Sequence, residues 1–182
     1  MAELTLLPPM TRFIFQGGQV ACKTAGDAFR LELSEKSCRA NANEERAALW
    51  LGPDEYLLFA PTGDAGKIAV ELTTALAGIP HSLVEVSQRQ VAWRLSGPDA
   101  SAILNNGCPL DLDPAAFPPG MCTRTLLGKA QIVLWRQAAE EYHLDVWRSY
   151  SDYVRELLLD AARSEFANRT SEGDDHAQRS GG

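Results

Sequence analysis

The sequence predicts an α+β protein that contains a duplicated unit of strand, helix, hairpin and helix, with antiparallel or mixed sheets flanked by helices. Strand-like FIFQG at 13–17 and WRLSG at 93–97 each end in a glycine before a helical stretch. The period of the repeat exceeds that of solenoid units. Two later segments recur in the same order: ALW at 48–50 matches VLW at 133–135, and DEYLLF at 54–59 matches EEYHLD at 140–145.

We expect one globular domain over residues 1–164 that is made of two similar halves, about 12–78 and 82–164. A chain of 182 residues buries about 70% of its unfolded surface, which is enough to fold without disulfides or metals. From residue 165 the composition turns to Asn, Ser, Gly, Asp and Gln without apolar periodicity. Residues 165–182 are therefore expected to form a disordered tail.

The first half contains the patterns of a hairpin and of an amphipathic helix. Gly52 and Pro53 mark a tight turn between two apolar runs, and Thr62 or Asp64 caps the helix that follows. Apolar residues recur at helical spacing in that helix, which indicates one buried stripe. The expected elements are a strand at 13–17, a weak helix at 19–29, a polar connector at 34–45, strands at 46–50 and 56–60, and a helix that ends near 77.

The second half is centred on a strand at 91–95 that leads directly into a short helix. Ser96 or Gly97 serves as its N-cap, and Gly107 ends it in the residue type that best tolerates left-handed dihedrals. Residues 87–90 interrupt the preceding strand pattern, either as a bulge in one long strand or as a tight turn between two. The elements expected after this helix are strands at 121–127, 129–136 and 141–147 and a helix whose capping box is Ser149 with Asp152.

Composition and charge exclude several classes of partner. Seventeen basic against 24 acidic residues give a net charge of −7 with no Lys/Arg cluster, which argues against a nucleic-acid or anionic-membrane surface. The first ten residues contain Glu3 and a break at Pro8-Pro9, so they are expected to form neither a signal peptide nor a membrane span. The four cysteines lie far apart without metal-ligand spacing, and with no export signal they indicate the reducing cytoplasm.

No recognised motif for catalysis or cofactor binding occurs in the sequence. Glycine-rich phosphate loops, a G-x-S-x-G elbow and an H-E-x-x-H helix are absent. His81 lies in a loop and His176 in the expected tail. His143 lies in a strand, where it is either a structural or exposed residue or one that faces a pocket. We therefore assign no catalytic, cofactor-binding or metal-ligating residue.

Three further sets of residues invite a functional interpretation, and each also has a simpler structural one. Acidic pairs at hairpin turns are expected as solvated charges rather than as general acids. Tryptophans in predicted strands are either core residues or anchors for a partner. A polar run that interrupts a strand is a bulge, a buried polar contact or a partner site. The three sets are Asp54-Glu55 with Glu140-Glu141; Trp50, Trp93, Trp135 and Trp147; and Gln88-Arg89-Gln90.

The proline-rich segment 108–120 is the predicted docking surface for a partner. Its prolines exclude a regular helix or strand ladder, and Leu110, Leu112, Phe117 and Met121 are apolar residues that no predicted element buries. A loop stiffened by prolines also loses less entropy on docking. The alternative is that the segment folds back over the core of its own domain.

The order of these segments resembles the glycine-cleavage T-protein superfamily. The resemblance covers about residues 13–162 and implies the fold of the folate-binding domain of T-protein. Within the superfamily, the chain is similar to the γ-subunit family of heterotetrameric sarcosine oxidases. The segments that carry the resemblance are SGPDA at 96–100, NNGCPLDL at 105–112, EYHLDVW at 141–147, LGPDEYLLFAP at 51–61 and VEVSQR at 84–89.

The resemblance implies a cytoplasmic hetero-oligomer in which this chain is a non-catalytic γ subunit with a structural or assembly role. The implied α subunit binds NAD and carries the folate domain, the β subunit carries FAD and FMN, and the δ subunit binds zinc. The implied reaction is the oxidative demethylation of sarcosine to glycine, which consumes oxygen. Its other products are hydrogen peroxide and either formaldehyde or 5,10-methylenetetrahydrofolate. The γ chain itself is expected to bind no flavin, NAD or metal.

One position departs from the T-protein pattern. Relatives that bind folate carry a Glu directly after the aromatic residue of the last strand, and the matching position after Tyr142 is His143. A histidine cannot supply the carboxylate that pairs with the adjacent donors of a pterin, which argues against folate binding. The alternative function is a free-standing folate-binding one-carbon protein of the same superfamily.

Overall fold

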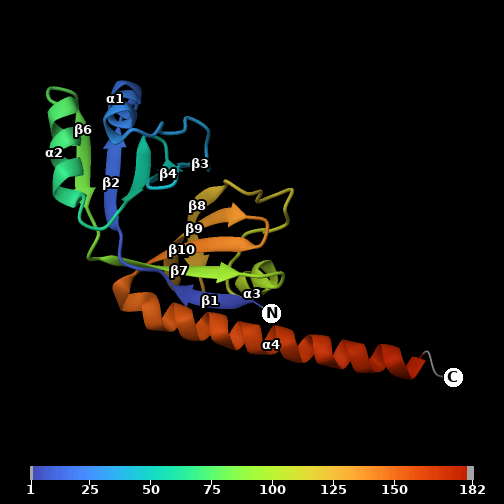
Figure 1. The fold of residues 1–182 in the computed structure, drawn as a ribbon. Helices are drawn as coiled ribbons and strands as arrows, with labels where there is room; N and C mark the ends of the chain where they lie inside the picture. Colours follow the sequence, from blue (N-terminus) through green and yellow to red (C-terminus); the bar gives the residue numbers. More distant parts are fainter. Residues whose placement is uncertain (1, 180–182) are drawn as a thin grey trace.

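Two five-stranded antiparallel sheets form the molecule, and helices cover one face of each (Figure 1). The computed structural model describes residues 2–179, and side-chain surroundings are described up to residue 167. The predicted α+β class with antiparallel sheets is confirmed.

The first sheet is covered by α1 (Gln19–Phe29) and α2 (Ala65–Ala75). The predicted stripe of α2 is buried, since Ile68, Leu72 and Leu76 are at most 1% exposed. Burying a side chain of this size contributes about 1.5–3 kcal/mol. In spatial order the strands are β3 (Ala40–Ala42), β4 (Ala47–Gly52), β5 (Glu55–Ala60), β2 (Thr11–Gly17) and β6 (His81–Glu85).

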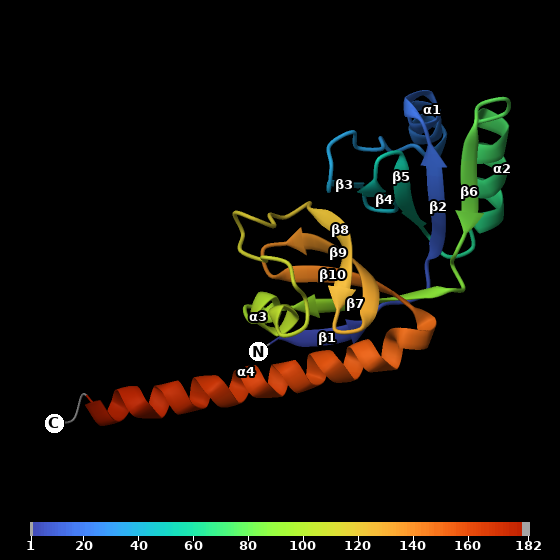
Figure 2. The same cartoon turned by 180° about the vertical axis from the view of Figure 1, so that it is seen from behind.

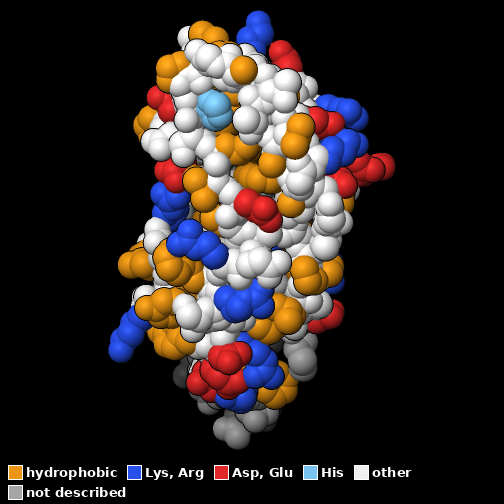
Figure 3. Space-filling model, turned by 90° about the vertical axis from the view of Figure 1, so that its left-hand side faces the viewer, with side chains coloured by type: hydrophobic (Ala, Val, Ile, Leu, Met, Phe, Trp, Pro, Cys, Tyr) orange, Lys and Arg blue, Asp and Glu red, His pale blue; other side chains and the backbone are white. Residues whose placement is uncertain are grey.

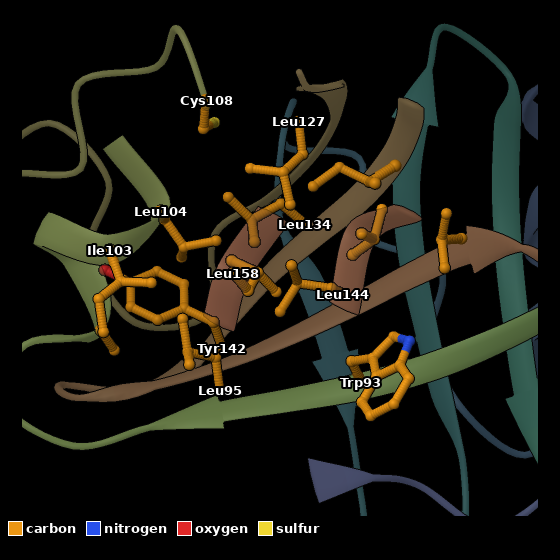
Figure 4. Packing of buried hydrophobic residues seen from close by; sticks show 14 of the residues in the cluster. Trp93, Leu95, Ile103, Leu104, Cys108, Leu127, Leu134, Tyr142, Leu144 and Leu158 are labelled. Carbon is orange, nitrogen blue, oxygen red and sulfur yellow. The ribbon is translucent and has the colours of Figure 1, made fainter. Parts of the chain in front are cut away.

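The second sheet is covered by α3 (Ala100–Asn105) and by α4 (Ser151–Arg179), which follows the 3-10 turn η1 (Arg148–Tyr150). Figure 4 shows how Tyr142 and Leu144 of this sheet point toward Leu104 of α3 and Leu158 of α4. In spatial order the strands are β1 (Glu3–Leu6), β7 (Gln90–Ser96), β10 (Glu141–Trp147), β9 (Ala130–Ala138) and β8 (Cys122–Leu127).

One edge strand of each sheet, β6 in the first and β1 in the second, comes from an unexpected part of the chain. Strand β6, at 81–85, pairs with β2 in the first sheet, although the sequence pattern places residues 82–164 in the second half. Strand β1, which was not predicted, pairs with β7 in the second sheet. Both strands are short, and each pairs with whichever sheet edge is free. Their own residues do not specify which edge that is.

The chain crosses from the first sheet to the second between β6 and β7. Residues 87–89 form a turn between two strands, so the predicted alternative of a tight turn is correct and that of a bulge in one long strand is wrong. The backbone N–H of Arg12 donates to the Ser87 hydroxyl at 3.0 Å, which holds the turn against β2. Figure 1 shows β2 and β7 running in clearly different directions on the two sides of this crossing.

The ends of the helices differ from the predicted caps. Helix α3 begins at Ala100 with Asp99 as its N-cap, rather than Ser96 or Gly97. Gly107 is needed for close packing and not for a left-handed backbone, because an added Cβ would lie 3.1 Å from Leu157 and 3.2 Å from Leu127. The predicted capping box of α4 is replaced by η1, and the Ser151 hydroxyl accepts a hydrogen bond from the Trp93 indole at 3.1 Å.

Helix α4 extends well past the globular part of the chain (Figure 2). Val154 and Leu158 in its first turns are buried in the core of the second sheet. The helix continues to Arg179, although the composition from residue 165 onward predicts a disordered tail. Residues 165–179 contain no proline and a single glycine, so no residue in this stretch interrupts the helical backbone. Residues 180–182 lie outside the described range.

The proline-rich segment folds over the core of its own domain, and the docking prediction for it was wrong. Leu112 is 1% exposed and Phe117 is 2% exposed, both within the core of the second sheet. The Arg136 guanidinium donates to the Leu112 carbonyl at 3.1 Å and to the Phe117 carbonyl at 2.8 Å. A buried arginine thus replaces the backbone ladder that prolines cannot form.

Candidate functional site

We call the region where the two sheets meet the inter-sheet interface. It contains two buried charged residues, Arg12 and Asp145, that are 133 positions apart in the sequence. Along β10 the side chains alternate: Tyr142 and Leu144 face the helices, whereas His143 and Asp145 face the first sheet. The apolar residues of this interface are Ala47, Leu49, Leu51, Leu57, Phe59, Val86, Cys122 and Val133, with Met10, Ile14, Ala40 and Trp135 packed against them.

An ion pair between Arg12 and Asp145 joins the two sheets. Arg12 Nε donates to Asp145 Oδ2 at 2.7 Å, and the side chains are 1% and 0% exposed. Arg12 also donates through Nη1 to the Met10 carbonyl at 3.2 Å, and its guanidinium lies 5.5 Å from the centre of the Phe59 ring. Because both charges are removed from water, each strongly requires the presence of the other.

His143 lies beside this ion pair and is 2% exposed. Its Nε2 is 3.6 Å from Asp145 Oδ2, which is beyond hydrogen-bond distance. Its ring lies 5.1 Å from that of Phe59 and 5.9 Å from that of Trp135. Of the readings given to His143, the structure supports a buried structural residue that fills the inter-sheet interface.

A hollow of about 350 Å³ opens at the end of this interface, and we call it the inter-sheet hollow. On one side Arg124 of β8 donates to Glu55 at 2.7 Å and 3.4 Å, which joins the sheets a second time. On another side the Arg89 guanidinium lies 5.3 Å from the centre of the Trp147 ring. The lining residues are Ile14, Leu51, Glu55, Val86, Arg89, Gln90, Arg124, Gln131, Ile132, Val133, Asp145 and Trp147.

Two buried acceptors at the hollow have no hydrogen-bond partner among the described residues. These are Asp145 Oδ1 and Gln90 Oε1, both of which belong to residues that line the hollow. Such atoms cost free energy when they are buried without a donor. Both atoms are thus buried at the rim of the hollow without a donor from the described residues.

The sequence-predicted candidates are scattered rather than brought together. Glu55 pairs with Arg124 at the hollow, whereas Glu140 and Glu141 lie at the distant β9–β10 turn. His81 is exposed and its Nδ1 lies 2.7 Å from the Ile79 carbonyl. His176 lies outside the described side chains. Across the described part of the chain, no three His, Cys, Asp or Glu residues form a group that could hold a metal ion.

The tryptophans divide between core and surface. Trp93 is 7% exposed in the core of the second sheet, and Trp50 and Trp135 are partly buried. Trp147 is 48% exposed and lies under Arg89. Core packing thus explains three of the four, and Trp147 alone has the exposed geometry of a binding residue.

Arg12 and Asp145 were not singled out from the sequence. The available signal was a charged residue directly before the apolar run FIF at 13–15 and another inside the alternating EYHLDVW at 141–147. Each is recognisable as a buried position only once its sheet is known to be covered on both faces, by helices on one and by the other sheet on the other. They are 133 positions apart, so their pairing depends on the tertiary structure and cannot be read from a local pattern.

Burial sets the reactivity of the thiols. It raises the pKa of Cys122 from 9.0 to about 12 and raises the pKa of Cys108 as well. We expect both thiols to resist alkylation in the folded chain at pH 8 and to react after denaturation, which mass spectrometry of labelled peptides would measure. Since an unfolded thiol ionises near pH 9, the stability from buried Cys122 is complete below that pH and falls as pH approaches 12. Rapid native labelling of Cys122 would contradict this expectation.

The surface carries no broad field of one charge on the face seen in Figure 3, where basic, acidic and hydrophobic side chains are interspersed. Among the helices of the described range, none is both long enough and apolar enough to cross a membrane.

Comparison with known proteins identifies the fold. The structure is similar to the glycine cleavage system aminomethyltransferase T from Bartonella henselae, with a TM-score of 0.63 and 16% identity, over 89% of this chain and 46% of that one. The molecule therefore has a T-protein-like fold with two antiparallel sheets. The family model for the sarcosine oxidase, gamma subunit family matches residues 19–165, and the chain belongs to that family.

Two further similarities are to sarcosine oxidases. Sarcosine oxidase subunit gamma of Corynebacterium sp. (strain P-1) is 36% identical over 129 residues, which is 71% of this chain and 62% of that protein. The chain thus spans less than two thirds of the length of this curated relative. A chain of the heterotetrameric sarcosine oxidase from Corynebacterium sp. U-96 matches with a TM-score of 0.84 and 25% identity, over 90% of this chain and 84% of that one.

Proposed function

We propose that this chain is the non-catalytic γ subunit of a heterotetrameric sarcosine oxidase in the cytoplasm. The observation that carries the proposal is the match to the gamma subunit family over residues 19–165 together with the shared fold of a chain from the heterotetrameric enzyme. The proposed partners are an α, a β and a δ subunit. The assembled enzyme converts sarcosine and oxygen into glycine and hydrogen peroxide, with formaldehyde or 5,10-methylenetetrahydrofolate as the one-carbon product.

The cofactors of the reaction belong, in this proposal, to the partner subunits: FAD, FMN, NAD, zinc and tetrahydrofolate. The role of the γ chain is structural. His143 favours a tetrahydrofolate site in a partner subunit over one in this chain. Its buried ring packs against Phe59 and Trp135 at the position where folate-binding relatives are expected to have a carboxylate.

We also propose that the two sheets arose by duplication of one unit. Their spatial orders correspond strand for strand, with β3-β4-β5-β2-β6 in the first sheet and β8-β9-β10-β7-β1 in the second. The fifth strand of the first sheet, β6, directly follows its own unit, whereas the fifth strand of the second sheet, β1, lies at the N-terminal end, ahead of the first unit. If the proposal is right, superposing the sheets overlays Trp50 on Trp135 and Leu72 of α2 on Leu157 of α4; helices on unrelated sides of their hairpins would contradict it.

Co-purification tests the proposed function. A tagged full-length chain, co-expressed with the α, β and δ subunits, is expected to retain all three and to carry a flavin absorption band. The same chain expressed alone is expected to show neither flavin absorption nor stoichiometric zinc. The proposal fails if the tagged chain purifies alone while the other subunits assemble and produce peroxide from sarcosine without it.

A further inference from the structure

The two sheets cover each other's inner faces only in part. Strands β2 and β7 run in clearly different directions (Figure 1), so part of each inner face extends past the inter-sheet interface. Three exposed hydrophobic side chains lie on these uncovered parts: Val84, Leu126 and Trp147, which are 45%, 49% and 48% exposed. Large apolar side chains that gather on a sheet face are typical of a surface that another molecule covers.

Strand register places these three side chains around the inter-sheet hollow. Val84 is opposite Ile14 of β2, which lines the hollow on the side of the first sheet. Leu126 is opposite Gln131 of β9, which lines it on the side of the second sheet, and Trp147 lines it directly. Residues opposite each other in neighbouring strands lie on the same face of their sheet. The hollow and the three exposed side chains therefore form one apolar groove, which we call the inter-sheet groove.

The charges beside the inter-sheet groove are positive where they are not paired. The two carboxylates that line the hollow each form an ion pair with an arginine. The Arg89 guanidinium lies 5.3 Å from the centre of the Trp147 ring, and neither Arg89 nor Arg148 forms an ion pair with a described residue. These two arginines are adjacent, because the backbone N–H of Arg148 donates to the Arg89 carbonyl at 2.9 Å. In a chain with a net charge of −7, this is a local excess of positive charge beside apolar surface.

This charge favours a different protein over a second copy of the chain as the occupant of the groove. Two copies related by a two-fold axis through the groove would present the same surface to each other. That arrangement would bring Arg89 and Arg148 of one copy close to those of the other, and like charges across an interface oppose association. A segment that carries carboxylates has the complementary charge.

We infer that the inter-sheet groove is a docking surface for an acidic segment of a partner subunit. An apolar side chain of that segment occupies the hollow against Trp147, and a carboxylate beside it pairs with Arg89. The hollow of about 350 Å³ has room for such a side chain, and its lining includes the apolar residues Ile14, Val86 and Val133. Trp and Arg are the residue types that most often dominate the energy of an interface. The identity of the partner as the α, β or δ subunit rests on the proposed function.

Competition for a place in the assembled enzyme tests the inference. Two full-length copies with different tags, one wild type and one variant, are co-expressed with the α, β and δ subunits. The ratio of the two tags in the purified complex is then compared with their ratio in the lysate. Trp147→Ser removes the exposed ring and Arg89→Glu reverses the charge, and each is expected to be excluded at least about tenfold. Arg89→Lys, which keeps the charge, is expected to be excluded less than Arg89→Glu.

Matched changes on the helical side of the first sheet are expected to compete equally with the wild type. Val70→Ser removes an exposed apolar side chain of α2, and Arg30→Glu reverses the charge of an exposed arginine at the end of α1. Circular dichroism of each isolated variant shows whether it is folded. Because Arg89 is exposed, Arg89→Glu leaves the core intact and decides the test even where Trp147→Ser fails to fold.

Incorporation of Arg89→Glu equal to that of the wild type would overturn the inference, as would equal incorporation of a folded Trp147→Ser. Both results leave the proposed function intact, because the wild-type chain still assembles. A wild-type chain that is not incorporated at all contradicts the proposed function, and the inference fails with it. Light scattering of the isolated chain tests for a second copy in the groove. A wild-type dimer that becomes a monomer in Trp147→Ser would also overturn the inference.

Discussion

Replacing Arg12 by methionine is expected to destabilise the folded chain by about 3–5 kcal/mol, because it leaves the Asp145 carboxylate buried without its partner. The two side chains are 1% and 0% exposed and are joined at 2.7 Å, so water cannot replace the guanidinium without opening the inter-sheet interface. A loss of this size is a large share of the roughly 5–15 kcal/mol by which domains are stable. Urea unfolding followed by circular dichroism measures it.

The double variant Arg12→Met, Asp145→Leu is expected to recover much of this loss, since it replaces the buried ion pair by apolar side chains of similar volume. The exposed pair of Arg30 and Glu71 supplies the control: Arg30→Met is expected to change the stability by about 1 kcal/mol or less. If Arg12→Met were as mild as Arg30→Met, the inter-sheet interface would have to be open to water in solution.

Such an ion pair contributes more to the relative placement of the sheets than to net stability. The apolar residues of the inter-sheet interface, such as Leu49 and Leu57, attract the sheets without direction. The Arg12–Asp145 pair and the Glu55–Arg124 pair each fix one strand of the first sheet against one strand of the second. Any partner that recognises surfaces of both sheets at once depends on that placement.

The sequence predicts several helices and strands correctly, because the spacing of apolar residues that defines each of them lies within a short stretch of chain. Strands β4, β5 and β10, the stripe of α2 and the turn at Gly52-Pro53 all follow from the spacing of apolar residues and from turn chemistry. The likeness between the strand at 13–17 and the strand at 93–97 corresponds to β2 and β7, which occupy equivalent places in their sheets.

The strand pairing and the candidate site depend on contacts between distant residues. Nothing in His81–Glu85 says that it pairs with β2, and nothing in residues 3–6 predicts a strand beside β7. The hollow needs Asp145 of β10, Gln90 of β7 and Arg124 of β8 to lie near Glu55. Their proximity is created by the packing of two sheets, which no single window of the sequence contains.

The proline-rich segment shows why apolar residues in a loop do not indicate a docking surface. No element predicted from the sequence buries its apolar side chains, yet Leu112 and Phe117 enter the core of the second sheet. The missing partner was Arg136, a β9 residue that satisfies carbonyls of the loop from inside. Its guanidinium also lies 5.2 Å from the centre of the Tyr142 ring, which ties the loop to β10.

Phe117→Ala is accordingly expected to destabilise the isolated chain by about 3–5 kcal/mol, since it removes a buried ring and leaves a cavity beside the loop. Phe117 is 2% exposed, so this loss arises without any partner. Thermal or urea unfolding of the chain alone measures it. A docking residue would behave in the opposite way, with normal stability of the isolated chain and loss of the complex.

The neighbouring Ala116→Ser gives the matched control, because Ala116 is exposed in the same loop and a surface change of this size is expected to stay within about 0.5 kcal/mol. Both variants are then carried into the co-purification with the α, β and δ subunits at a temperature where each is folded by circular dichroism. Under that condition Phe117→Ala is expected to retain its partners, because the ring faces the core and not the surface. Full stability of Phe117→Ala together with loss of the partners would instead return the loop to the role of docking surface.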